Sequence, residues 1–292
     1  MIDILTEILI KRFWTLLGRD EKGAAWEWDK RSLLDVQNLT MKFGGLIAID
    51  DLSFSAKKDH ITSIIGPNGA GKTTVFNCLT GFYKATAGSM YLNKENNKMD
   101  LKKFSDFKVA QKAGVARTFQ NIRLFPQMSV LENMMVAQHN KLMKASGFSI
   151  LGLLNSRSYL QKEKEAMEIS KYWLNIIGLT NRADDNAGDL PYGDQRKLEI
   201  VRAMCIEPNL LCLDEPAAGL NAKESAELNK LLKFIKNDKK TGILLIEHDM
   251  SVVMGISDHV VVLNYGKKIF EGTAKETKNS PEVIEAYLGT DE

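Results

Sequence analysis

Hydrophobic residues alternate with polar ones along parts of the chain, in a pattern that predicts β-strands. Between residues 33 and 56 apolar side chains recur at about every second position, and Gly44-Gly45 divides the span into two strands. Apolar runs at 61–65, 210–214 and 242–247 predict buried strands. Shorter strands are predicted at 88–92, 115–120, 260–263 and 268–271.

Other segments show the period of an α-helix. Apolar residues recur every three to four positions at 129–140, 159–177 and 222–236. Residues 141–157 contain Gly, Ser and Asn without a period, which predicts a loop or an insertion. Strands that alternate with helices predict an α/β fold with a mainly parallel core sheet, and the span of about 122–190 is predicted to be an inserted helical subdomain.

Residues 1–32 are predicted to be an N-terminal amphipathic extension of a domain that covers residues 33–292. Apolar residues recur at helical spacing from Ile2 to Leu16, and most charged side chains fall on the other side. Such a helix can pack on its own domain, or it can lie on a membrane surface or on a partner protein. The pattern fits both alternatives.

Composition and charge narrow the class of protein. The chain has 292 residues, of which 44% are hydrophobic and 26% charged, as is typical of a globular protein with a sizeable core. A net charge of +2 is too weak to gather nucleic acid, so no nucleic-acid partner is predicted. Cys78, Cys205 and Cys212 have apolar neighbours and no C-x-x-C spacing, which favours reduced core thiols over a disulfide or a zinc site.

No apolar run approaches the roughly 20 residues that span a bilayer, and the N-terminus does not have the pattern of a signal peptide. A role at a membrane would therefore require a partner.

Residues 63–80 carry the most specific chemical signal in the sequence. The segment from Gly66 to Thr73 has the spacing G-x-x-x-x-G-K-T, and it lies between a predicted strand and a predicted helix. Gly66, Gly69 and Gly71 allow positive φ angles and leave room for a phosphate beside the backbone. Successive N–H groups and the helix N-terminus offer partial positive charge to an anion. The chain is therefore predicted to bind a nucleoside triphosphate.

Two side chains of this loop are predicted to have separate roles. Lys72 can reach the β- and γ-phosphates, and the hydroxyl of Thr73 can bind Mg²⁺. The predicted nucleotide-binding set of the loop is Gly66, Pro67, Asn68, Gly69, Ala70, Gly71, Lys72, Thr73 and Thr74.

Polar residues follow three other predicted strands, and in an open α/β sheet ligands bind beyond the carboxyl ends of strands. Asp214 ends an apolar strand, where P-loop proteins hold Mg²⁺ with an aspartate, and Glu215 is placed to orient or deprotonate the attacking water. His248 could hydrogen-bond the γ-phosphate and Glu215. The amide of Gln120 could touch Mg²⁺ or the attacking water.

Roughly residues 33–290 resemble the ATP-binding subunit of an ABC transporter, because five motifs occur there in a fixed order. They are the Walker A segment 66–74, the Q-loop glutamine Gln120, residues 190–196 at the place of the L-S-G-G-Q signature, the Walker B segment 210–215 and the switch histidine His248. The resemblance implies a P-loop NTPase fold, with a mainly parallel core sheet, an antiparallel β subdomain and an inserted helical subdomain. It also implies ATP hydrolysis with ATP and Mg²⁺ as cofactors.

Further segments narrow the resemblance to the high-affinity branched-chain amino acid importers, and to the first of their two ATPase subunits. These segments are 43–46, 117–125, 132–133, 217–221 and 286–289. The resemblance implies that Tyr192 and Gly193 belong to the signature that contacts a partner subunit's nucleotide. It also implies that Phe43 stacks on adenine, although an aromatic residue in a strand could equally belong to the core.

Three positions depart from the common family pattern. Pro191 lacks the hydroxyl of the usual signature serine, and Asp194 brings a negative charge that could weaken closure on a γ-phosphate unless it turns away. Asn221 stands where many relatives have aspartate, but this subfamily tolerates asparagine at that position. The backbone N–H of Gly193 and the following helix N-terminus remain available to a phosphate.

The resemblance also implies partners and a location. They are a second ATPase chain (a copy of this chain or a sister subunit), two transmembrane permeases and, indirectly, a periplasmic solute-binding protein. The chain would lie on the cytoplasmic face of the inner membrane, held there by the permeases. Two alternatives stay open: a soluble ABC ATPase that acts on nucleic acid or ribosomes, and a structural subunit that binds ATP with little hydrolysis.

Overall fold

The structure, a computed structural model, describes residues 32–94, 97–105, 107–145 and 157–288. Almost all of the predicted extension, residues 1–31, lies outside these ranges. Its two alternative roles therefore stay predictions.

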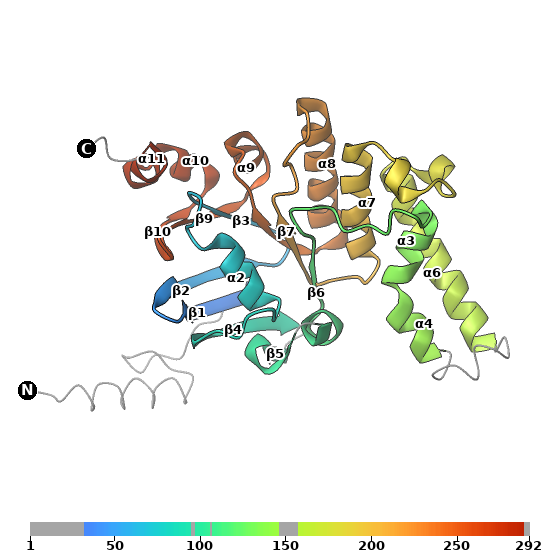
Figure 1. Cartoon of the computed structure of the whole chain (residues 1–292), viewed down its shortest axis with the longest axis horizontal. Helices are drawn as coiled ribbons and strands as arrows, with labels where there is room; N and C mark the ends of the chain where they lie inside the picture. Colours follow the sequence, from blue (N-terminus) through green and yellow to red (C-terminus); the bar gives the residue numbers. More distant parts are fainter. Residues whose placement is uncertain (1–31, 95–96, 106, 146–156, 289–292) are drawn as a thin grey trace, which may run out of the picture. The chain divides into compact units, whose positions relative to one another are not determined.

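A mainly parallel six-stranded sheet forms the core of the described residues (Figure 1). Its strand order is β10-β9-β3-β8-β7-β6, in which only β10 is antiparallel to its neighbour. The strands are β3 (Ile61–Ile65), β6 (Val115–Arg117), β7 (Leu210–Asp214), β8 (Gly242–Ile246), β9 (His259–Asn264) and β10 (Lys267–Gly272). Every residue of β3, β7 and β8 is buried, as expected for parallel strands that are covered on both faces.

A second sheet of four strands contains the N-terminal part of the domain. Its order is β2-β1-β4-β5, and β4 is antiparallel to both β1 and β5. The strands are β1 (Ser32–Phe43), β2 (Leu46–Lys57), β4 (Ala87–Lys94) and β5 (Asn97–Asp100). The predicted antiparallel β subdomain is confirmed.

Most of the helices lie beside the six-stranded sheet (Figure 1). They are α2 (Lys72–Leu79), α3 (Val130–Ala137), α4 (His139–Ala145), α6 (Arg157–Ile176), α7 (Tyr192–Met204), α8 (Ala222–Lys239), α9 (Met250–Ile256), α10 (Ala274–Asn279) and α11 (Pro281–Leu288). Helices α3 and α4 both pack on α6, and Figure 1 shows the three grouped to one side of the six-stranded sheet. They fall within the span where the sequence predicts an inserted helical subdomain.

Several predicted boundaries differ from the structure. The strand predicted at 115–120 ends at Arg117. Residues 141–157 are not all loop, because α4 continues to Ala145 and α6 begins at Arg157. Short helical turns at 101–103, 109–113, 180–182 and 187–189 were not predicted.

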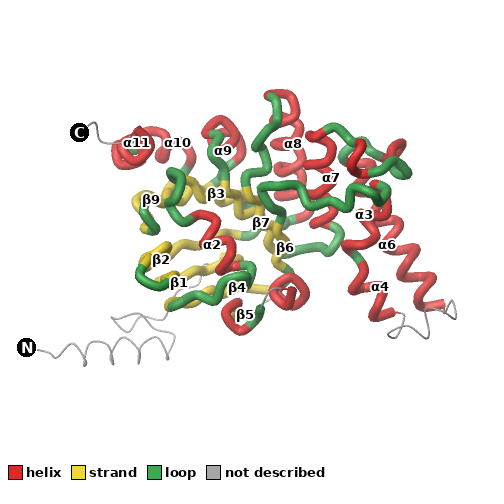
Figure 2. Tube along the Cα trace, viewed as in Figure 1, coloured by secondary structure: helices red, strands yellow, loops and turns green. Residues whose placement is uncertain are grey.

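The sheet brings several loops to one edge. The loops after β3, β6, β7 and β8 leave the carboxyl ends of neighbouring parallel strands, and Figure 2 draws them in green. The residues predicted to carry the chemistry lie on these loops or at their ends.

The three cysteines are free and buried. Burial raises the pKa of Cys78 to about 11 and the pKa of Cys212 to about 12. Both thiols therefore stay protonated at neutral pH and contribute to packing.

Candidate functional site

The loop between β3 and α2 has a backbone that its glycines make possible. Gly66, Gly69 and Gly71 have φ angles of 149°, 81° and 97°, in the region that side chains rarely adopt. A Cβ atom at Gly71 would lie 2.6 Å from the carbonyl oxygen of Ala48, and one at Gly66 would lie 2.1 Å from that of Leu263. The predicted P-loop spacing therefore coincides with positions where the fold accepts only glycine.

Lys72 begins α2 and turns its side chain back over the loop. Its Nζ donates hydrogen bonds to the carbonyl oxygens of Gly66 at 2.7 Å and Pro67 at 2.9 Å. Burial lowers the pKa of Lys72, and the negative charges of Glu215 and Asp214 act in the opposite direction. These two acids are therefore close enough to the loop lysine to interact with it electrostatically.

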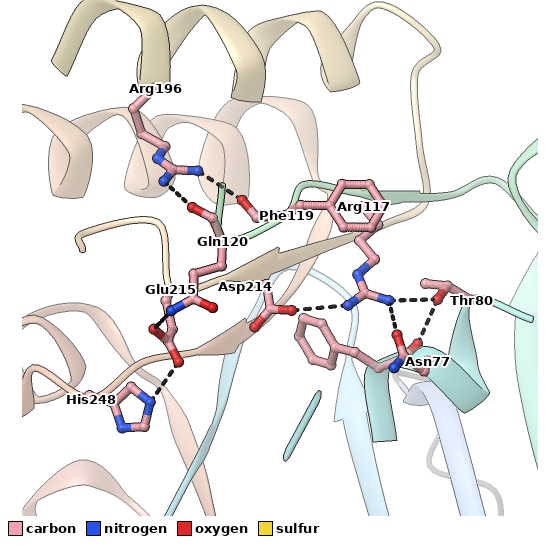
Figure 3. A network of polar contacts seen from close by, with 10 residues as sticks. Asn77, Thr80, Arg117, Phe119, Gln120, Arg196, Asp214, Glu215 and His248 are labelled. Atoms are coloured by element: carbon pink, nitrogen blue, oxygen red, sulfur yellow. Dashed lines mark hydrogen bonds and ion pairs between the residues drawn. The ribbon is translucent and has the colours of Figure 1, made fainter. Parts of the chain in front are cut away.

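Glu215 is the meeting point of the predicted catalytic residues (Figure 3). Gln120 donates from Nε2 to Glu215 Oε2 at 2.8 Å, and His248 Nε2 lies 2.6 Å from Glu215 Oε1. Since a carboxylate only accepts, His248 donates in this contact. The three residues come from the loops after β6, β7 and β8. The contact of His248 with Glu215 is the predicted one, whereas the contact of Gln120 with Glu215 was not predicted.

Asp214 has a partner that sequence reasoning missed. Arg117 Nη2 donates to Asp214 Oδ2 at 3.0 Å, and both side chains are only 7% exposed. Arg117 also donates to Asn77 and Thr80 of the segment that follows the P-loop (Figure 3). Burial raises the pKa of Asp214, and the contact with Arg117 opposes that rise. The guanidinium thus ties the Walker B acid to the P-loop helix.

The signature region starts α7. Tyr192 and Gly193 open the helix, and the hydroxyl of Tyr192 donates to the carbonyl oxygen of Ala218 at 3.3 Å. Gly193 packs so closely on Glu224 that a Cβ atom would lie 2.6 Å from its Oε1. Asn221 caps α8, since its side chain accepts from the backbone N–H groups of Lys223 and Glu224.

The charge of Asp194 is paired. Its Oδ1 lies 2.9 Å from Nζ of Lys197, one helical turn further on, and Lys197 also contacts Glu227. The sequence contained this signal, because an acid and a lysine at i and i+3 lie on the same face of a helix.

Phe43 ends β1 and is 42% exposed. Its ring meets the edge of Tyr83 with centroids 5.2 Å apart. An exposed ring is available for stacking, so the predicted adenine contact stays a prediction.

A buried acid, Glu247, supports the loop after Walker B. Its Oε1 accepts from the backbone N–H of Ala217 at 2.7 Å, and its Oε2 accepts from that of His248 at 3.2 Å. Burial raises the pKa of Glu247, and these backbone hydrogen bonds oppose the rise. Sequence reasoning gave this residue no role, because its partners are backbone groups that leave no mark in the sequence.

Comparison with known proteins gives the family. The family model described as "ABC transporter" matches residues 49–218, and the model described as "Branched-chain amino acid ATP-binding cassette transporter" matches residues 267–292. The chain belongs to the ABC transporter family. The resemblance drawn from the five motifs is thereby confirmed.

Two relatives match nearly the whole domain. The high-affinity branched-chain amino acid transport ATP-binding protein BraF of Pseudomonas aeruginosa is 47% identical over 259 residues, which are 89% of this chain and 98% of the relative. The corresponding protein LivG of Escherichia coli strain K12 is 49% identical over 257 residues, which are 88% of this chain and 98% of the relative.

Solved structures give the same fold. The crystal structure of the ADP conformation of an ATP-binding cassette of an ABC transporter matches with a TM-score of 0.75 and 32% identity. That match covers 88% of this chain and 99% of the other. The predicted ABC cassette fold is confirmed.

The donor set near the loop suits Mg²⁺. Magnesium keeps several of its waters and takes one or two protein oxygens besides those of a phosphate. Asp214 and the hydroxyl-bearing Thr73 are such donors, so the residues present fit this ion. In the part of the chain that the structure describes, no helix combines the length and the apolar character needed to cross a membrane.

Proposed function

We propose that this ABC transporter chain hydrolyses ATP to drive the uptake of branched-chain or chemically related amino acids through separate permease subunits. The observation that carries the proposal is the contact of Glu215 with both Gln120 and His248, and the charge of Glu215 also acts on the pKa of Lys72 in the P-loop. The names of the relatives at 47–49% identity support the choice of cargo. The paired charge of Asp194 argues against a subunit that binds ATP with little hydrolysis.

The chain's own residues would act as follows. The backbone N–H groups of residues 66–74 and the ammonium of Lys72 bind the triphosphate. Glu215 accepts a proton from the attacking water while the water oxygen bonds to the γ-phosphorus and the bond to the ADP oxygen breaks. Gln120 and His248 hold the Glu215 carboxylate from both sides and so fix its direction.

Asp214, Thr73 and Gln120 would hold Mg²⁺, which neutralises charge that develops on the phosphate oxygens when it is bound. Arg117 occupies one oxygen of Asp214, Oδ2. This contact would keep the carboxylate of Asp214 oriented when the ion is bound.

The site would be completed by a second ATPase chain, whose signature, equivalent to Tyr192 and Gly193, contacts the nucleotide. ATP would then join two chains, and hydrolysis would let them separate. The helical subdomain of about 122–190 and the Gln120 loop would carry this movement to two transmembrane permeases on the cytoplasmic face of the inner membrane. A solute-binding protein would deliver the cargo to the permeases.

The test is uptake by a reconstituted assembly. The chain is co-expressed with two permeases and a sister ATPase of a branched-chain amino acid importer. Uptake of radiolabelled leucine, presented by the solute-binding protein, into vesicles is then measured with internal Mg-ATP. We expect uptake that stops when ATP is replaced by ADP. Leucine uptake that does not depend on this chain would contradict the proposal.

Asp194→Gln is expected to change kcat for ATP hydrolysis by no more than about fivefold, because an ion pair at a helix surface contributes only about 0–1 kcal/mol. Steady-state hydrolysis by the parent and the variant at saturating Mg-ATP checks this. A tenfold rise in kcat would show that the charge of Asp194 opposes closure in spite of Lys197.

A further inference from the structure

One fully buried arginine joins the signature helix to the Q-loop of the same chain. Arg196 of α7 is 0% exposed. It donates to the carbonyl oxygens of Phe119 at 2.9 Å and Gln120 at 2.6 Å (Figure 3). It also donates to Tyr192 Oη at 3.1 Å and pairs with Glu199 at 2.9 Å.

The same helix holds the next part of the loop. Glu199 Oε1 accepts from the backbone N–H of Arg123 at 2.9 Å, and Arg202 Nη2 donates to the carbonyl oxygen of Arg123 at 2.6 Å. Three successive turns of α7 therefore bind the main chain of residues 119–123.

These contacts explain how Gln120 can reach Glu215. After β6 ends, Arg196 supplies the donors for the carbonyl groups of Phe119 and Gln120, in contacts that are partly buried. Because the backbone carbonyl of Gln120 is fixed, its side chain can extend to Glu215, where Nε2 lies 2.8 Å from Oε2. A planar guanidinium can supply two parallel donors, which a lysine in its place cannot.

We propose that Arg196 is a positioning residue for ATP hydrolysis: it fixes the backbone of the Q-loop so that Gln120 directs Glu215. Because Arg196 also contacts Tyr192, it links the signature motif of a chain to the acid–base residue of that same chain. This inference rests on the proposed function of Glu215 and adds a residue to which the motifs assign no role.

The test is a double-mutant cycle on kcat. Arg196→Lys, Gln120→Ala and the double variant are compared with the parent in the full-length chain at saturating Mg-ATP. We expect Arg196→Lys to lower kcat by about tenfold to a hundredfold, since a misplacement of about 1 Å costs rates of that order. We also expect an unchanged affinity for a non-hydrolysable ATP analogue, because the P-loop is untouched.

The double variant decides the mechanism. If Arg196 acts through Gln120, the double variant hydrolyses ATP as fast as Gln120→Ala alone. Losses that multiply, an Arg196→Lys variant with the kcat of the parent, or a Gln120→Ala variant with the kcat of the parent would each overturn the proposal. A parent chain without any ATP hydrolysis would instead refute the proposed function.

Two further variants serve as a control and as a substitute for Arg196→Lys. Arg182→Lys alters a partly exposed arginine that also pairs with an acid three residues away, Asp185, and it is expected to leave kcat unchanged. If circular dichroism shows that Arg196→Lys does not fold, Glu199→Gln replaces it in the same cycle. That variant removes the charge that orients Arg196 and keeps the shape of the side chain, and the same outcomes support or overturn the proposal.

Discussion

Glu215→Gln is expected to lower kcat for ATP hydrolysis by about 10²–10⁴-fold, the range that a general base contributes. A glutamine at this position keeps the length of the side chain but cannot take a proton from water. The affinity for Mg-ATP is expected to stay close to that of the parent, because the P-loop and Asp214 are unchanged.

Single-turnover release of phosphate and equilibrium binding of ATP measure the two quantities separately. Glu168→Gln, which alters an exposed acid on α6, serves as the matched control. A Glu215→Gln variant that hydrolyses ATP as fast as the parent would remove Glu215 from the role of base.

Lys72→Ala is expected to weaken ATP binding by about tenfold to a hundredfold, because a hydrogen bond from a charged group contributes about 1.5–3 kcal/mol. The ammonium of Lys72 donates to the carbonyl oxygens of Gly66 and Pro67 within the loop, and it can turn from them to a phosphate. Binding of a fluorescent ATP analogue measures the change.

The control for this variant is Lys141→Ala, which removes an exposed ion pair with Glu207 and is expected to leave binding unaltered. An affinity of Lys72→Ala equal to that of the parent would mean that the triphosphate does not sit in this loop.

Much of the fold could be predicted because its signals are local. The strands at 61–65 and 210–214 have the boundaries that their apolar runs indicate. The edge strand β5 (Asn97–Asp100) contains a single apolar residue, Met99, and such a short segment carries neither alternation nor an apolar run. The predicted strand at 115–120 is too long, because Arg196 takes the carbonyl groups of Phe119 and Gln120.

The residues of the candidate site likewise fall into those that the sequence predicts and those that only the structure shows. Spacing identified Lys72, Asp214 and Glu215, since the chemistry fixes both the residue types and their order. Arg117 and Arg196 could not be found, because the partners that give them their roles are distant in the sequence. Asp214 lies 97 positions from Arg117, and the carbonyl groups that Arg196 contacts, those of Phe119 and Gln120, lie 77 and 76 positions from it. Only the folded chain shows which buried arginine meets which carbonyl group.

The central claim is that the P-loop and the two acids at the end of β7 act on the same triphosphate, in a site that a second chain completes. Sedimentation velocity of Glu215→Gln, with and without Mg-ATP, tests it most directly, because this variant should hold ATP without consuming it. We predict monomers without nucleotide and a dimer that contains one ATP per chain when Mg-ATP is present. A chain that sediments as the same species in both conditions, with no ATP bound, would contradict the claim.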